Sequence, residues 1–328
     1  MIVTDVRYRD KGGDVKEGFY MEPFLIENLV PTPNYLAQDR DMVGIISGNG
    51  EVRNGKSTMA IQLGYFLAWM QAGGRMDLRK DVDGKYINPV VLKKPNKPVR
   101  FNYENLTYTP ESLMELAHTL HEKYGKGQVI VYDETSGLDS AGTMKSVNQM
   151  LAHFFQTCGA YNHIILIVLP NFFKLNEDIA TTRSMFLIDT YSDANWRRGN
   201  FNFYGPTDKE WLYLNGKRLR GVRARYGSQN PTFYGRFGDW IPFDKEEYEA
   251  QKQKKLKSKL YGTREQKNRE KMMGLLHLLK VRTSLTTAEV AEELSEVLFR
   301  KITPISLEND LSNYLKFTKK HQEGGNAP

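Results

Sequence analysis

The sequence predicts an α/β protein in which a mainly parallel sheet carries helices on both of its faces. Three apolar segments rich in β-branched residues carry this prediction, at residues 42–46, 129–132 and 164–169. Each segment ends at glycine, carboxylate or proline residues. The last segment contains no polar residue, which is typical of a central strand that is covered on both sides.

Composition narrows the class of protein. The chain has 328 residues and a hydrophobic fraction of 40%, which is enough for a large domain with a small partner domain. A single cysteine, Cys158, excludes a disulfide framework and fits a reducing compartment, so we expect a cytoplasmic protein, in the host cytoplasm if it is viral. No apolar run approaches the length of a membrane span, so we expect no membrane association. The net charge of +7 suits a polyanionic partner or a soluble surface.

A glycine-rich turn follows the first apolar segment and precedes a helical pattern over 57–72. The turn reads Gly50-x-x-x-x-Gly55-Lys56-Ser57, the pattern of a phosphate-binding P-loop. Glycines let successive N–H groups point into an anion-sized concavity, and the start of the helix adds positive charge. We expect Lys56 to reach the β- and γ-phosphates of ATP and Ser57 to hold Mg²⁺. The predicted nucleotide-contacting residues are Gly50, Glu51, Val52, Arg53, Asn54, Gly55, Lys56, Ser57 and Thr58.

Two carboxylates, Asp133 and Glu134, end the second apolar segment. Between the P-loop and these carboxylates we expect a strand over 99–103 and a helix that Thr109 caps. In this position Asp133 and Glu134 have the pattern of a Walker B strand. Asp133 would bind Mg²⁺ through water, and Glu134 would polarise the water that attacks the γ-phosphate.

Further polar residues follow the third apolar segment. Asn171 comes directly after Pro170 and is either a sensor of the γ-phosphate or a simple loop amide. Arg183, Arg197 and Arg198 are candidates for an arginine that acts in trans on a neighbouring subunit. Each of the three is individually as well explained by a surface position or by contact with a phosphate backbone.

The segment 41–200 contains both Walker motifs, Asn171 after an apolar strand, and Asp-Ile-Ala-Thr-Thr-Arg183 before another strand. With these features it resembles the HerA/FtsK class of DNA-pumping ATPases. The phage Zot-like ATPases are similar. The resemblance implies a ring, usually a hexamer, that moves double-stranded DNA through its centre. Two departures stand out: Arg53-Asn54 replaces the small residues usual in the loop, and Asn171 stands where a glutamine is typical.

The segment before the core, residues 1–40, is a lead-in. After the core we expect a β-hairpin appendage over 201–244, with Asn215-Gly216 as its turn. Basic residues interleaved with aromatics in this region suit nucleic acid, or else form a solvated sheet face. The residues concerned are Lys217, Arg218, Arg220, Arg223 and Arg225, with Tyr204, Tyr213 and Tyr226.

The C-terminal part changes in composition. Residues 245–271 are rich in Lys, Glu and Gln and predict a solvated, helical linker. Residues 272–320 predict three short helices, with Thr286-x-x-Glu289 as a capping box and Ser306 as another cap. Such a unit resembles a helix-turn-helix module for DNA, although small helical units also dock proteins. We expect residues 321–328 to be disordered.

These observations predict an ATP-driven DNA translocase, used in viral genome packaging or in transfer of a mobile element. The alternative is a switch-type ATPase that loads or remodels a protein complex, with the helical domain as its docking arm. A membrane-associated assembly ATPase of the Zot kind would carry a transmembrane segment, and the sequence shows none.

Overall fold

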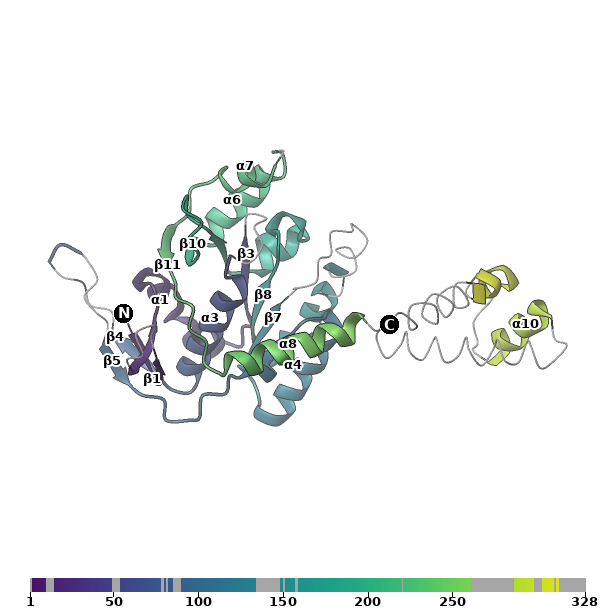
Figure 1. Cartoon of the computed structure of the whole chain (residues 1–328), viewed down its shortest axis with the longest axis horizontal. Coiled ribbons are helices and arrows are strands. Elements are labelled where there is room, and N and C mark those ends of the chain that lie inside the picture. The colour runs from purple at the N-terminus through teal and green to yellow at the C-terminus, as the bar shows by residue number, and fades with distance from the viewer. Residues whose placement is uncertain are drawn as a thin grey trace, which may run out of the picture. The chain divides into compact units, whose positions relative to one another are not determined.

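The computed structural model describes residues 2–9, 15–48, 54–77, 80, 82–84, 90–133, 148–149, 151–156, 159–219, 221–260, 286–297, 303–309 and 311–312. The chain divides into two compact units, Met1–Lys252 and Gln253–Pro328. Figure 1 shows the course of the chain, and the first unit holds the large sheet.

The sheet of the first unit has seven strands in the order β11-β10-β9-β3-β8-β7-β6. Strands β9, β3, β8, β7 and β6 run parallel to one another, and β10 and β11 continue the sheet antiparallel. The mainly parallel sheet is therefore confirmed. The strands are β3 (Met42–Gly48), β6 (Leu106–Thr107), β7 (Val129–Asp133), β8 (Ile164–Val168), β9 (Phe186–Tyr191), β10 (Asn200–Tyr204) and β11 (Phe233–Arg236).

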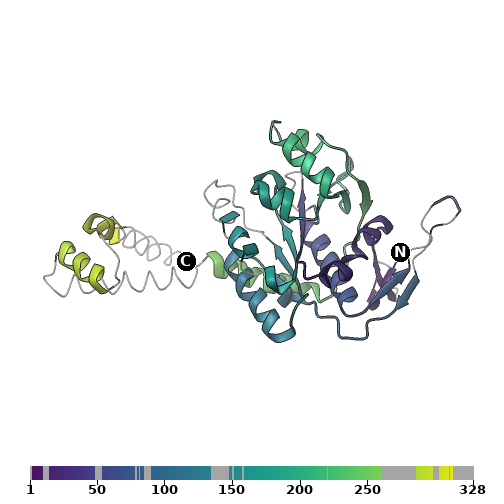
Figure 2. The ribbon, with the colours of Figure 1, turned by 180° about the vertical axis from the view of Figure 1, so that it is seen from behind.

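Helices cover both faces of the sheet, as the unbroken apolar strands predict. Alternate residues of β3 point to opposite sides: Met42 and Ile46 join one buried cluster, and Val43 and Ile45 join the other. The first cluster contains α1 (Pro23–Leu29), α2 (Thr32–Leu36) and α3 (Lys56–Gln71). The second contains α4 (Pro110–Tyr124), the helical residues 151–156 and α6 (Pro206–Gly216). Figures 1 and 2 show the sheet between these layers.

Helix α3 follows the P-loop as predicted and is buried on every side. Its residues from Met59 to Met70 are all buried, which explains why the helix is apolar around its whole circumference. The one amide among them, Gln62, donates from Nε2 to the carbonyl oxygens of Gly238 and Trp240 at 2.9 and 2.8 Å. Residues 238–240 are thereby fastened across α3.

The predicted strand over 99–103 is wrong. The segment ends in a tight 3-10 turn at Tyr103–Asn105, where Asn102 accepts a hydrogen bond from the Glu104 N–H at 2.7 Å. Asparagine side chains that bond the local backbone in this way compete with strand pairing. The edge strand β6 comes only after this turn, and Thr109 caps α4 as predicted.

The predicted hairpin at Asn215-Gly216 is also wrong, because the segment forms helix α6. Pro206 stands at the start of the helix, where its fixed φ favours helical backbone. Lys209, Leu212 and Tyr213 are buried at a helical spacing. This packing outweighs the local turn signal, and Gly216 ends the helix against the ring of Phe173.

The aromatic residues expected beside the basic ones on this segment belong to the core. Tyr204, Tyr213 and Tyr226 are all buried, and Tyr226 lies on α7 (Val222–Tyr226). Lys217 and Arg218 are exposed. Stacking of bases on these three tyrosine rings is therefore excluded.

A buried lysine links α6 to the wide helical turn at Asp178–Arg183. The ammonium of Lys209 donates to the carbonyl oxygens of Ala180, Thr181 and Ser184 and to the Ser184 hydroxyl, at 2.6 to 2.8 Å. The turn at 178–183 is a π-helix, whose last carbonyls lack partners inside the turn. Lys209 supplies hydrogen-bond donors to these carbonyls.

Two small sheets and the first part of α8 complete the first unit. The sheets pair β1 (Ile2–Arg9) with β2 (Val15–Tyr20) and β4 (Arg75–Asp77) with β5 (Val90–Lys93). Helix α8 (Lys245–Leu260) occupies the predicted linker.

The second unit contains α10 (Thr287–Val297) and helical residues 304–309. The predicted capping box at Thr286 and Glu289 is confirmed, since Glu289 Oε2 accepts from the Thr286 N–H at 2.6 Å. The cap of the next helix is Thr303 rather than Ser306, because the Ser306 N–H donates to the Thr303 hydroxyl at 3.3 Å. Among the described residues no helix has the length and apolar character needed to cross a membrane.

Candidate active site

The two Walker segments meet at one edge of the sheet. Strands β3 and β7 run parallel on either side of β8, and Ile46 and Asp133 both pair in register with Val168. The carboxyl ends of these strands therefore lie side by side, where open α/β sheets bind their ligands. Strand β8 separates the two Walker segments in the sheet.

Part of the predicted site lies outside the described residues. Gly50, Glu51, Val52, Arg53 and Glu134 belong to this part. The structure describes Asn54, Gly55, Lys56, Ser57 and Thr58 at the start of α3, and Asp133 at the end of β7.

Gly55 makes the turn into α3. Its φ of 93° lies in the left-handed region, and a Cβ atom there would lie 2.8 Å from the ring of Phe237. Both the backbone conformation and the close approach of the ring require glycine. The second glycine of the sequence motif thus has a structural reason at this position.

Asn54 fastens the end of the P-loop to strand β9. Its side chain is buried, and its Nδ2 donates to the Thr190 carbonyl oxygen at 2.5 Å. Its Oδ1 accepts from Lys56 Nζ at 3.1 Å. The departure from a small residue at position 54 therefore holds the loop end against the sheet and directs the Lys56 ammonium.

The two predicted metal ligands, Ser57 and Asp133, are connected by side chains of α8. Asp133 is buried, and its Oδ2 lies 3.2 Å from Lys252 Nζ. Lys252 Nζ also donates to the Tyr248 hydroxyl at 3.3 Å, and that hydroxyl is hydrogen-bonded to Ser57. Burial raises the pKa of Tyr248, so its phenol is neutral across the physiological range.

A hollow of about 580 Å³ adjoins the start of α3. Gly55 and Thr58 form its border with the P-loop, and its size is in the range of small-molecule sites. Apolar, aromatic and charged side chains line the hollow. They belong to Arg198, Phe237, Asp239, Ile241, Lys245, Tyr248 and Glu249.

Asn171 follows β8, so it stands at the same edge of the sheet as the Walker segments. Its Oδ1 accepts a hydrogen bond from the Phe173 N–H at 2.9 Å and so caps the short turn at Phe172–Lys174. This contact describes a structural role for the amide oxygen, and the sensor role stays a prediction.

The three candidate arginines have different surroundings. Arg198 lines the hollow beside Gly55. Arg183 and Arg197 each lie 3.9 Å from a carboxylate of their own segment, Asp178 and Asp193 respectively. The side chains of Arg183 and Arg197 are 45% and 75% exposed. Of the three, the structure brings only Arg198 to the P-loop.

Sequence reasoning missed Tyr248 and Lys252. Both stand in a segment so rich in Lys, Glu and Gln that it predicts a solvated linker. The signal that could have found them is Tyr248 itself, the first of the two tyrosines in that run, since a tyrosine in a charged helix indicates one buried contact. The partner of Lys252 could not be read from the sequence, because 119 positions separate it from Asp133.

Comparisons with known proteins give a distant structural similarity and no family. No family model matches the chain, and no curated protein matches it. Among solved structures, the chain is similar to the N-terminal domain of zonular occludens toxin from Neisseria meningitidis, with 12% sequence identity and a TM-score of 0.32. The match covers 64% of this chain and 98% of that domain. The case for function therefore rests on the residues of this chain.

Proposed function

We propose that this chain is an ATPase that binds Mg²⁺·ATP where β3, β7 and the start of α3 meet. One observation carries the proposal: Ser57 of the P-loop motif and Asp133 of the Walker B motif are joined through two side chains at one edge of the sheet. A chance match of either motif would not bring these residues into one site.

The residues fit a magnesium ion by their chemistry. A hydroxyl and a carboxylate are oxygen ligands of the kind Mg²⁺ prefers, and the carboxylate already has one cation, Lys252, beside it. Ser57 and Asp133 would hold the ion. When bound, Mg²⁺ neutralises charge on the phosphates and orients them for transfer.

The chain's own residues supply the rest of the chemistry. Lys56, directed by Asn54, provides a fixed positive charge for the phosphates, and the start of α3 adds the positive end of the helix dipole. Glu134 would accept a proton from the attacking water. The hollow beside Gly55 would take the nucleoside end, with Phe237 as an apolar wall and Arg198 as a charged one.

The finer proposal is that hydrolysis drives movement of double-stranded DNA by a ring of these chains. The net charge of +7 and the resemblance of the Walker segments to DNA-pumping ATPases support it. Lys217 and Arg218 are exposed, as is the ring of Trp211 earlier in the same segment, and these side chains offer cationic and aromatic contacts to a nucleic acid. The trans-acting arginine of such a ring would be Arg183 or Arg197, because Arg198 lies beside the P-loop of its own chain.

The test is steady-state ATP hydrolysis with and without linear double-stranded DNA, at low and moderate salt. We expect DNA to stimulate hydrolysis, salt to weaken the stimulation, and Glu134→Gln to abolish hydrolysis while nucleotide still binds. A double variant, Lys217→Glu with Arg218→Glu, should lose the stimulation and keep the rate without DNA.

Other outcomes would overturn separate parts of the proposal. Hydrolysis that is indifferent to DNA but rises with a protein partner would favour a loader or remodelling ATPase in place of a DNA motor. Absence of nucleotide binding to the unmodified chain would overturn the ATPase itself.

A further inference from the structure

The first turns of α8 lie over the position that a metal ion would take. We infer that α8 is a displaceable latch, in which Lys252 and Tyr248 hold the metal ligands Asp133 and Ser57 until Mg²⁺·nucleotide binds and releases the helix. This inference rests on the function proposed above, because it concerns the same two ligands.

The ion pair between Lys252 and Asp133 is well buried. The side chains of Lys252 and Asp133 are only 18% and 3% exposed, and their charged atoms lie 3.2 Å apart. A carboxylate this deep in the protein requires a compensating cation, because water does not reach it. Lys252 is that cation, and the carboxylate needs one whether a lysine or a metal ion supplies it.

Tyr248 occupies the other half of the position. Its side chain is 6% exposed, and its hydroxyl contacts Ser57, Tyr108 and the Lys252 ammonium. The ammonium is therefore placed between the carboxylate of one Walker motif and a hydroxyl bonded to the other. The described site provides one cation position between these ligands, and Lys252 stands at it.

A metal ion and Lys252 compete for this position. A magnesium ion with its waters would need the Asp133 carboxylate oxygen that now contacts Lys252 Nζ, so the ammonium would have to leave that oxygen. The two cations would also repel each other if both stayed beside the same carboxylate. Binding of the metal ion therefore requires Lys252 to leave Asp133 and the Tyr248 hydroxyl to break its contact with Ser57.

Apart from Tyr248 and Lys252, the first turns of α8 are lightly held, so their release depends mainly on the contacts of these two residues. From Asp244 to Gln253, Tyr248 is the one buried residue. Asp244 caps the helix by accepting from the Glu247 N–H at 2.7 Å, and the ring of Phe243 lies 5.7 Å from that of Tyr248. Segments with so few buried contacts open at low free energy.

Release of α8 would reach the second unit. The boundary between the two compact units falls after Lys252, inside α8, so the latch residues belong to the first unit while the rest of the helix leads the chain into the second. The state of the nucleotide site is thereby linked to the helix from which the C-terminal unit departs.

The experiment measures the Mg²⁺ concentration at which a fluorescent ADP analogue binds the full chain, for the unmodified protein and three variants. Lys252→Gln removes the competing charge and should lower the Mg²⁺ midpoint about tenfold, the size of one lost charge-assisted contact. Lys252→Arg keeps the charge and should restore the midpoint to within about twofold. Lys93→Gln removes the same charge from an exposed position at the end of β5 and should leave the midpoint unchanged.

Hydrogen exchange of the amides of 245–260 provides the second readout. We expect Mg²⁺·nucleotide to speed exchange in the unmodified chain, and Lys252→Gln to speed it without nucleotide. If nucleotide binds but the midpoint is the same in all variants and exchange in α8 is unchanged or slower, the latch is overturned and the ATPase proposal stands. If nucleotide does not bind the unmodified chain, the ATPase proposal itself fails.

Discussion

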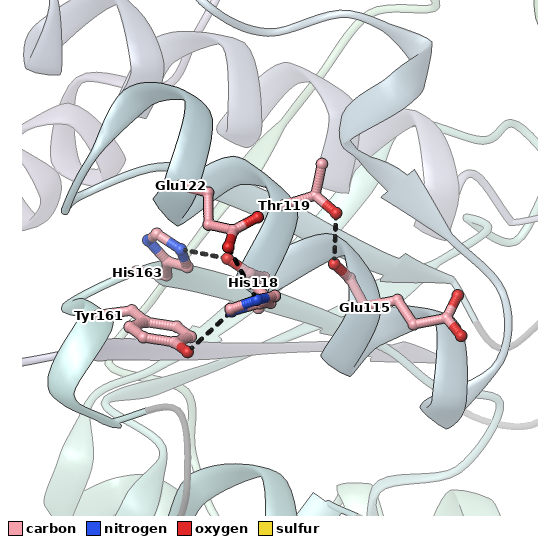
Figure 3. A network of polar contacts seen from close by, with 7 residues as sticks. Glu115, His118, Thr119, Glu122, Tyr161 and His163 are labelled. Carbon is pink, nitrogen blue, oxygen red and sulfur yellow. Dashed lines mark hydrogen bonds and ion pairs between the residues drawn. The ribbon is translucent and has the colours of Figure 1, made fainter.

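Asp133 and His163 are buried polar groups at opposite ends of neighbouring strands, and they are satisfied in different ways. Asp133 ends β7 and has a lysine side chain from a distant helix as its partner. His163 precedes β8 and has two backbone partners: its Nδ1 accepts from the Gln128 N–H at 3.1 Å, and its Nε2 donates to the Ala117 carbonyl oxygen at 3.0 Å. Figure 3 shows His163 among its neighbours.

The different partners indicate different roles: Asp133 belongs to a binding site, and His163 belongs to the structural scaffold. Backbone partners are fixed by the strands and by α4, so His163 has no alternative arrangement and holds one end of the sheet together. A lysine at the end of a long side chain can be exchanged for another cation without disturbing a strand. The contrast therefore predicts that changes at the carboxyl edge alter binding, whereas changes at the amino edge alter stability.

The largest expected effect is at the carboxyl edge. Replacement of Lys56 by Met should lower kcat/KM for ATP hydrolysis by about 100-fold or more, because the phosphates lose their fixed positive charge. The midpoint of thermal unfolding should change little. Steady-state kinetics and calorimetry on the same preparation check both parts, and a large loss of stability would blur the contrast between the two edges.

The matching change at the amino edge is His163→Leu. It leaves the partly buried Gln128 N–H without its acceptor and removes the second donor from the Ala117 carbonyl oxygen, so we expect the free energy of unfolding to fall by roughly 1–3 kcal/mol. Nucleotide affinity should stay within about twofold at a temperature where the variant is folded. Denaturant titration gives the first value and fluorescence titration the second; weakened nucleotide binding would contradict the assignment of His163 to the scaffold.

The amino edge should also give the protein a dependence on pH. Burial lowers the pKa of His163 from 6.5 to about 4, and the Gln128 N–H that points at Nδ1 favours the same neutral form. As pH falls from 6.5 to 4, the unfolded chain binds a proton at His163 before the folded protein does. The free energy of unfolding, at its full value above pH 6.5, therefore decreases by about 3 kcal/mol in total over this range.

The control for this pH dependence is His163→Gln, whose amide donates and accepts without titrating. Unfolding free energies measured from pH 4 to 7 should fall less steeply in this variant than in the unmodified protein. Parallel curves for the two proteins would show that the acid sensitivity comes from other groups.

A smaller effect is expected from Asn54→Ala. The Thr190 carbonyl oxygen loses a buried donor, and Lys56 loses the acceptor that directs it, so nucleotide affinity should fall by roughly three- to tenfold. Asn54→Asp, which keeps an acceptor for Lys56 but not the donor to Thr190, separates the two contacts in the same titration.

The smallest effect is expected from His118→Ala on the outer side of α4. His118 lies 3.1 Å from Glu122 and 3.2 Å from the Tyr161 hydroxyl, but its side chain is 60% exposed (Figure 3). Water replaces such contacts at little cost, so the change in unfolding free energy should stay below about 0.5 kcal/mol. An effect as large as that of His163→Leu would mean that the whole histidine and tyrosine cluster acts as one unit.

The sequence predicts those parts of the fold that depend on local pattern. The apolar runs of β3, β7 and β8 and the P-loop with α3 are such parts, because strand burial, glycine content and helical period are all written in contiguous residues. The Asn215-Gly216 prediction failed for the opposite reason: the turn signal is local, but the burial of Leu212 and Tyr213 that overrides it comes from tertiary packing.

The candidate site divides in the same way. The P-loop and Asp133 follow from motifs, while the tie from Asn54 to Thr190 and the pair of Lys252 with Asp133 join residues 136 and 119 positions apart. Contacts at such separations depend on how the elements pack. Charge composition even pointed away from Lys252, since a run of Lys and Glu ordinarily indicates a solvated helix.

The buried ammonium of Lys209 gives the protein a chemical reporter of its own unfolding. An amine-reactive label reaches only exposed lysines, and Lys209 is fully buried with four acceptors around its nitrogen. Its labelling rate, read by mass spectrometry, would therefore follow the opening of α6 from the π-helix, while surface lysines of the same sample label at once and serve as internal standards.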